Sequence, residues 1–280
     1  MRQTQSITLR IQLFLLTGLV VLGVGCANLA AIREFADISA QSAAHTALVT
    51  QYVEFPERQK QFQPSSQHAR LDQMSRERAA QKERLLLRHA LIEEYMDALG
   101  QLATDEPVTY DKDIDAPGKA IVANKFAGEN DAGALRSVSK ILFRASTDGW
   151  RQRKLRELIA ESNSPFQEVV GALKRIVDQA FAGDTENEEI AIRNYYQPII
   201  LSSKDKAGIA ALEEWRDTRL AEVRMRRQAI TDYSEVLSKI AAGHQKLYDK
   251  RDDLDNKDLL QLMSRYAKHL RKRFDTLKKL

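Results

Sequence analysis

The sequence has few cysteines, glycines and prolines, and each shortage excludes a class of structure. A single cysteine, Cys26, allows no internal disulfide, so stability must come from a hydrophobic core. Twelve glycines and six prolines among 280 residues leave few points at which a helix would break. The sequence shows no strand pattern of convincing length and no repeat of fixed period. Together these absences predict an all-α fold.

The sequence also lacks the motifs that identify an enzyme or a metal site. No His-x-x-x-His or Glu-x-x-His pair occurs among its histidines, which are His45, His68, His89, His244 and His269. We expect His244 to be a hydrogen-bonded core histidine, since no acid or nucleophile is paired with it. The stretch 137–140 has the serine–lysine spacing of penicillin-interacting enzymes, but neither companion motif follows. We therefore expect no enzyme, metal site or bound cofactor, and an enzyme without a recognisable motif is a distant alternative.

Residues 104–118 are acidic and fit neither a helix nor a strand. Asp111, Asp113 and Asp115 alternate as carboxylates do in a calcium loop. The glycine expected at the sixth position is Ala116, however, and the glutamate expected at the twelfth is Val122. The pattern favours a solvated acidic loop, with cation binding as the open alternative.

Apolar residues recur at helical spacing over long stretches, which the few breakers divide. We expect helices over residues 28–53, 66–103, 119–126, 131–160, 165–181, 204–250 and 257–280. Ser164, Pro165 and Gln167 resemble a capped helix start, so one helix should begin at Pro165. Gly183 should end that helix, and another, interrupted by Pro198, should follow a cap at residue 184 or 185. We divide the chain into anchor-proximal helices over 26–103, an acidic loop and short helix over 104–130, and a C-terminal bundle region over 131–280.

A seven-residue register runs through 204–250 and predicts coiled-coil-like packing there. Arginines occupy the seam in its first half and apolar residues in its second, so we expect the C-terminal half to be packed and the first half more exposed. One seam position holds Ile209, Arg216, Val223, Ile230, Leu237 and His244, and the other holds Leu212, Arg219, Arg226, Tyr233, Ile240 and Leu247. The expected fold is an elongated bundle of long antiparallel helices.

Two basic clusters stand out although the net charge is only +4. They are candidate sites for an anionic surface or a protein partner, and a solvated helix face with neighbouring acidic residues is the alternative for both. Nucleic acid is not expected as a partner. The candidate residues are Arg216, Arg219, Arg226 and Arg227 in the first cluster and Lys268, Arg271, Lys272 and Arg273 in the second.

The N-terminus reads as an export signal. Arg2 and Arg10 precede a nearly uninterrupted apolar run over residues 11–24, which ends at Gly25 and Cys26. The segment Gly23-Val24-Gly25-Cys26 resembles the signal of bacterial lipoproteins, although that family usually has leucine at the place of Gly23. The resemblance covers about the first tenth of the chain. It implies that residues 1–25 are removed, that Cys26 carries a covalent lipid, and that Ala27, not being aspartate, favours the outer membrane.

An uncleaved signal anchor is the competing interpretation. Apolar character continues past Cys26 to Ile32, so residues 11–32 could span a bilayer, which needs roughly 20 apolar residues. In either case the body lies outside the cytoplasm, because Arg2 and Arg10 stay inside. The sequence thus predicts a non-enzymatic, lipid-anchored envelope protein with a helical surface for a protein partner. A signal-anchored periplasmic sensory or ligand-binding module is the alternative.

Overall fold

The computed structural model describes residues 29–103, 132–147 and 152–279. Helices and short connections make up this part of the chain, and it contains no strand. The elements are α2 (Ala30–Ala43), α3 (Ala47–Lys60), η2 (Ser65–Gln67), α4 (His68–Leu102), α6 (Ala132–Thr147), α7 (Gln152–Ile176), η3 (Val177–Phe181), α8 (Ala182–Ser202), α9 (Lys206–Asp249) and α10 (Lys257–Leu277). The predicted all-α, elongated bundle is therefore confirmed.

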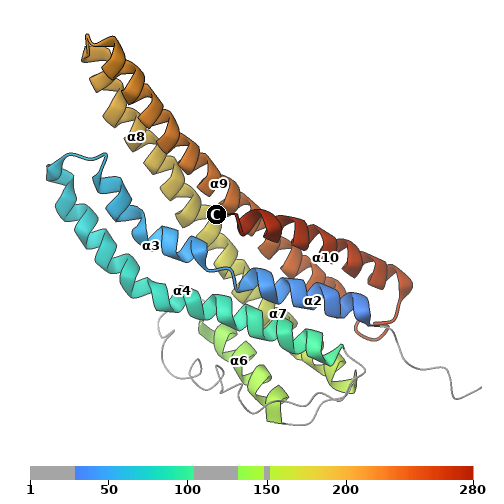
Figure 1. The fold of residues 1–280 in the computed structure, drawn as a ribbon. Coiled ribbons are helices and arrows are strands. Elements are labelled where there is room, and N and C mark those ends of the chain that lie inside the picture. The colour runs from blue at the N-terminus through green and yellow to red at the C-terminus, as the bar shows by residue number, and fades with distance from the viewer. Residues whose placement is uncertain (1–28, 104–131, 148–151, 280) are drawn as a thin grey trace, which may run out of the picture.

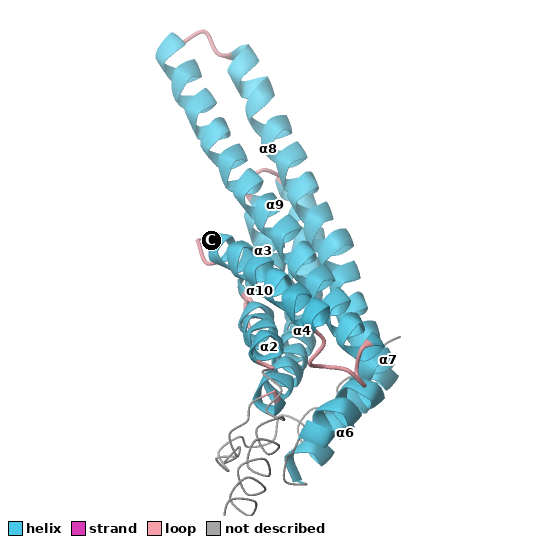
Figure 2. Ribbon diagram, turned by 90° about the vertical axis from the view of Figure 1, so that its right-hand side faces the viewer, coloured by secondary structure: helices cyan, strands magenta, loops and turns pink. Residues whose placement is uncertain are grey.

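The helices form a bundle from which one hairpin projects. α2 packs between α4 and α10, α7 packs on both α4 and α9, and α6 lies outside against α7. α8 and α9 form a long antiparallel hairpin that extends past the end of the α3–α4 hairpin (Figure 1). Seen from the side, the projecting hairpin and α6 lie at opposite ends of the molecule (Figure 2).

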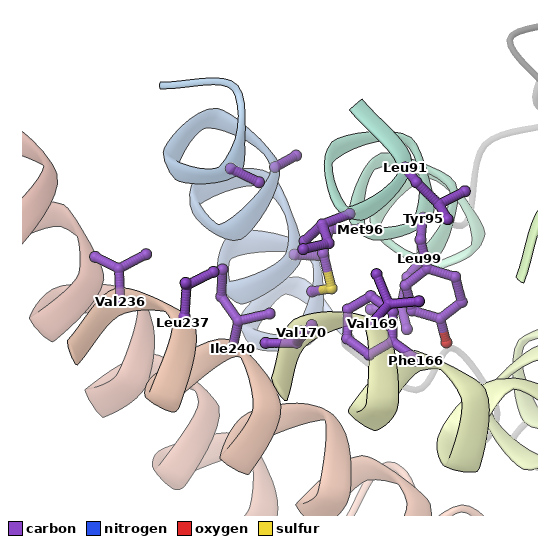
Figure 3. Packing of buried hydrophobic residues seen from close by; sticks show 14 of the residues in the cluster. Leu91, Tyr95, Met96, Leu99, Phe166, Val169, Val170, Val236, Leu237 and Ile240 are labelled. Carbon is purple, nitrogen blue, oxygen red and sulfur yellow. The ribbon is translucent and has the colours of Figure 1, made fainter. Parts of the chain in front are cut away.

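The main core lies where α4, α7 and α9 meet. Figure 3 shows aromatic and aliphatic side chains of these three helices pointing toward one another. The largest fully buried side chains include Tyr95 and Met96 from α4 and Phe166 from α7. The rings of Tyr95 and Phe166 lie 4.2 Å apart, between centroids. This core also takes residues from α2, α6 and α10, so it joins the expected N-terminal and C-terminal regions.

The helix expected over 28–53 is broken into α2 and α3. Ser39 and Ser42 donate side-chain hydrogen bonds to carbonyls four residues earlier in α2, which competes with regular helix geometry. The carbonyl of Ala43 lies 3.0 Å from Nδ1 of His89, on α4. Because that carbonyl has a partner outside its own helix, α2 can end there.

The predicted boundaries around residues 165 and 183 are wrong, because tertiary packing overrides the local signals. α7 runs through Pro165, at a typical cost of about 3 kcal/mol. The buried Phe166 and the Gln167 amide, which donates to the Ala241 carbonyl at 2.8 Å, hold this stretch against α9. Gly183 does not end a helix, because the chain passes through the π-helix η3 straight into α8, which also continues through Pro198.

α9 and α10 match their predicted ranges closely and have clear caps. Asp205 caps α9 by accepting from the amides of residues 207 and 208 at 3.1 and 3.0 Å. Asn256 caps α10 in the same way. None of the described helices is both long enough and apolar enough to cross a membrane.

Candidate functional site

A layer of paired charges, with buried carboxylates and partly buried arginines, crosses the bundle where the α8–α9 hairpin leaves it. We call it the charged layer and define it as Arg58, Arg78, Asp184, Glu188 and Arg226. Arg78 binds Asp184 with both terminal nitrogens of its guanidinium group, Nη1 and Nη2, at 2.5 and 2.7 Å. Glu188 accepts from Arg58 at 3.2 Å and from Arg226 at 2.8 Å through the same carboxylate oxygen. Four helices, α3, α4, α8 and α9, are thereby tied together.

The charged layer separates two hydrophobic cores. Along η3 and α8, Phe181 belongs to the main core, just before the layer, and Ala191 belongs to a second core just after it. On α9 the order is reversed, with Val223 in the second core and Ile230 in the main core. The second core contains Phe62, Ala191, Ile192, Tyr196, Ile200, Leu220 and Val223. The projecting hairpin is therefore packed around its own small core.

The π-helix η3 sets the start of α8 beside the layer. π-turns widen a helix by one residue and are frequent at functional sites. Here Phe181, at the end of η3, stacks on Tyr52 with centroids 4.8 Å apart, and Arg78 lies 4.2 Å above the same Tyr52 ring. Asp184, which we expected to cap a helix, instead faces Arg78. A small cavity of about 20 Å³ lies within this arrangement.

The charges of the layer favour a structural rather than a chemical role. Burial raises the pKa of Asp184, and the Arg78 guanidinium acts in the opposite direction. Removing one partner from such a buried pair is costly, since it leaves the other charge without compensation. Thr185 also lines the cavity, and its hydroxyl donates to the Ala182 carbonyl of the same helix at 2.8 Å. The layer fixes the register of four helices and so determines where the hairpin points.

His244 is fully buried in a hydrogen-bonded chain, as we predicted. Its Nδ1 lies 2.9 Å from Oδ1 of Asn163, and its Nε2 lies 2.5 Å from the Tyr95 hydroxyl, which in turn is 2.6 Å from Ser162. Because an amide oxygen accepts, Nδ1 carries the proton and Nε2 accepts from Tyr95. Burial lowers the pKa of His244 to about 3, so the ring is neutral. All three partners belong to the protein, and this series of hydrogen bonds links α4, α7 and α9.

His89 is a second buried histidine of the same kind. Its ring stacks on Tyr233, with centroids 5.5 Å apart and planes 5° from parallel. Nδ1 lies 3.0 Å from both the Ala43 carbonyl and the Tyr233 hydroxyl. Burial lowers the pKa of His89 to about 4.

One face of the α8–α9 hairpin carries exposed apolar side chains, which we call the hairpin strip: Tyr195, Ile199 and Trp215. Their exposed fractions are 43%, 39% and 59%. Tyr195 follows Glu188 by two helical turns, and Trp215 precedes Arg226 by three, so the strip continues the face that α3 covers lower down. Phe62, just after α3, contacts the Tyr195 ring edge-on at 5.8 Å. Beyond Phe62 the side chains of the strip are exposed to solvent.

The structure divides the predicted basic residues into inward and outward groups. Arg226 is largely buried against Glu188, and Arg273 is partly exposed where it binds the buried Asp232. Most others form surface ion pairs with acidic neighbours, namely Arg216 with Asp217, Arg219 with Glu222, Arg227 with Glu189 and Arg271 with Glu34. Lys268 and Lys272 are exposed on α10. Acidic partners therefore accompany most of these basic side chains.

The signal segment with the modified cysteine, Cys26, the acidic loop 104–118 and the helix expected over 119–126 lie outside the described residues. Within the described ranges, no group of three or more acidic, histidine or cysteine side chains could hold a metal ion. Compared with protein-family models, with curated proteins and with solved structures, the chain matches none of them.

Sequence reasoning missed the charged layer. Arg78 and Asp184 are 106 positions apart, and no local pattern distinguishes either from an ordinary surface charge. Arg78 lies in a highly polar stretch of α4, among several other charged residues. Arg226 shares its heptad seam position with the buried Tyr233, but the exposed Arg219 holds the same position, so the seam does not single out Arg226.

Proposed function

We propose that this protein is a lipid-anchored, non-enzymatic protein of the bacterial cell envelope that presents a helical surface to a protein partner, as a scaffold or accessory subunit. The hairpin strip is the observation that carries the proposal. It continues an existing helix-packing face, and exposed aromatic residues such as Tyr195 and Trp215 are the residue types enriched at protein interfaces.

Two core residues favour a lipid on Cys26 over an uncleaved membrane span. Leu29 and Ile32, which could have extended the span, are 5% and 0% exposed and pack in the main core. A side chain in that core cannot also face lipid. The apolar segment left for a span is then residues 11–28, close to the lower limit of about 17 residues. Ala27 supports the outer membrane as the destination.

Metabolic labelling with a radioactive fatty acid tests the anchor. The native protein should incorporate label, Cys26→Ser should not, and an inhibitor of the lipoprotein signal peptidase should leave residues 1–25 attached. An unlabelled native protein that keeps those residues would contradict the lipid anchor and favour the signal anchor.

Site-specific photocrosslinking in intact cells tests the surface. Benzoylphenylalanine at Trp215 should give a discrete crosslinked protein, and the same residue at Glu213, on the nearly opposite side of α9, should not. The product should disappear when Ile199→Asp is added, since a charge on the strip opposes apolar packing. Crosslinking that is equal at both positions, or that survives Ile199→Asp, would contradict a partner on the hairpin strip.

A further inference from the structure

Very little chain separates the proposed lipid site from the folded body. Only Ala27 and Asn28 lie between Cys26 and Leu29, and Leu29 is packed in the main core. Three residue steps span at most about 11 Å. Whatever holds Cys26 at a bilayer therefore holds the N-terminal end of α2 close to it.

That end of α2 lies at one end of the bundle, which we call the base: the first turn of α2 and the α9–α10 turn over residues 250–256. Phe35, near the start of α2, lies against Gly243, late in α9. Farther along α2, the Ala43 carbonyl lies at the same nitrogen of His89 as the Tyr233 hydroxyl. Tyr233 comes earlier in α9 than Gly243. Residue numbers rise along α2 as they fall along α9, so the two helices are antiparallel. α2 therefore starts near the last turns of α9 and runs away from the base (Figure 1).

α3 continues in the same direction beside α8. Tyr52 pairs with Phe181, Arg58 with Glu188, and Phe62 with Tyr195, so α3 and α8 are parallel. The chain thus travels from the base through the charged layer to the hairpin strip. α9 covers the whole distance in 44 residues, which corresponds to about 65 Å.

We propose that the base faces the bilayer surface and that the α8–α9 hairpin points away from it, with its tip tens of ångströms into the aqueous space. The inference rests on the membrane attachment in the proposed function. It does not depend on the kind of attachment. Both a lipid on Cys26 and an uncleaved anchor would hold the chain at the membrane immediately before Leu29. The partner of the hairpin strip is accordingly a water-exposed protein segment, not one embedded in the same bilayer.

Fluorescence quenching at single introduced cysteines tests this orientation. Once Cys26 is lipidated, the chain has no other thiol, so one added cysteine is labelled selectively. Asp255→Cys marks the base, Lys204→Cys marks the hairpin tip, and Lys82→Cys marks the outer face of α4 between them; all three native residues are exposed. The mature lipidated protein is reconstituted into vesicles of phosphatidylethanolamine and phosphatidylglycerol containing some lipid with a nitroxide on its headgroup.

We expect the Asp255→Cys label to lose at least several-fold more fluorescence than the Lys204→Cys label, which should match its value in nitroxide-free vesicles. Lys82→Cys should resemble Lys204→Cys. Equal quenching at base and tip, or stronger quenching at the tip, would overturn the orientation. Co-sedimentation with the vesicles separates the two proposals. A native chain that does not sediment refutes the membrane attachment and the orientation with it, whereas one that sediments with the wrong quenching order refutes the orientation alone.

Discussion

Acidification should destabilise this protein through His244, and the effect can be isolated with one substitution. The folded protein holds His244 neutral, with its pKa lowered to about 3, while the unfolded chain takes up a proton near pH 6.5. The stability that neutral His244 provides is therefore fully present above pH 6.5 and is lost as the pH falls toward the folded pKa. Between pH 7.5 and pH 5, this one group should cost about 2 kcal/mol of unfolding free energy.

The native profile alone does not isolate this contribution, because Glu94 acts in the opposite direction. Burial, with the neighbouring Glu93 and Asp97 carboxylates, raises the pKa of Glu94 to about 7. A raised carboxyl pKa means that the folded state gains a proton first as the pH falls, which adds stability. Subtracting the unfolding free energy of His244→Gln from that of the native protein cancels the pH dependence of Glu94 and of every other group that both proteins contain.

Urea denaturation followed by far-ultraviolet circular dichroism at pH 7.5 and pH 5 provides the measurement. His244→Gln should be less stable than native at pH 7.5, and the gap should close by about 2 kcal/mol at pH 5. His89→Gln should behave similarly, since burial lowers the pKa of His89 to about 4. Parallel pH profiles for the native protein and His244→Gln would refute a neutral, buried His244.

Three further predictions concern the packing and the hairpin strip, and two of them have a matched control substitution. Arg78→Met should lower stability by about 3 kcal/mol or more in urea denaturation, because it leaves a buried carboxylate unpaired, whereas Arg144→Met, in an exposed ion pair, should cost less than about 1 kcal/mol. Gly243→Ala should lower the melting temperature, since its methyl group would collide with the ring packed against it, at a cost of about 1–3 kcal/mol; Gly183→Ala, where the space is open, should raise stability by about 0.5–1 kcal/mol. Trp215→Ala should leave the melting temperature unchanged because the side chain is exposed, and should reduce partner crosslinking from a neighbouring position.

The long, regular elements of this fold could be predicted from sequence because apolar periodicity determines them. In α9, the predicted seam residues Val223, Tyr233 and Leu237 are fully buried, and the early seam residue Arg219 is exposed, as expected. Fold class follows from the same periodicity and from the scarcity of breakers. Proline and glycine were misleading where packing opposed them, as at Pro165, because contacts from α9 outweigh a local helix-breaking cost.

The arrangement of the site could not be predicted from the sequence, since it depends on which helices become neighbours. We expected Arg226, with the other seam arginines, in the more exposed half of α9, whereas the structure packs it against Glu188 of α8. Likewise, Tyr195 and Trp215 look like ordinary core residues in sequence. They are exposed only because the α3–α4 hairpin ends before it can cover them.

The charged layer also allows the outer part of the hairpin to unfold separately from the main core. The second core is small and is joined to the main core through ion pairs and hydrogen bonds rather than through a continuous apolar contact. Loss of the second core exposes little apolar surface and leaves the main core intact, so the free energy of opening the hairpin is smaller than that of global unfolding. Amides in the outer turns of α8 and α9 should therefore exchange with deuterium well before those near Tyr233. A partner that binds there would select the closed hairpin and slow that exchange, which makes local breathing of the hairpin a direct reporter of binding.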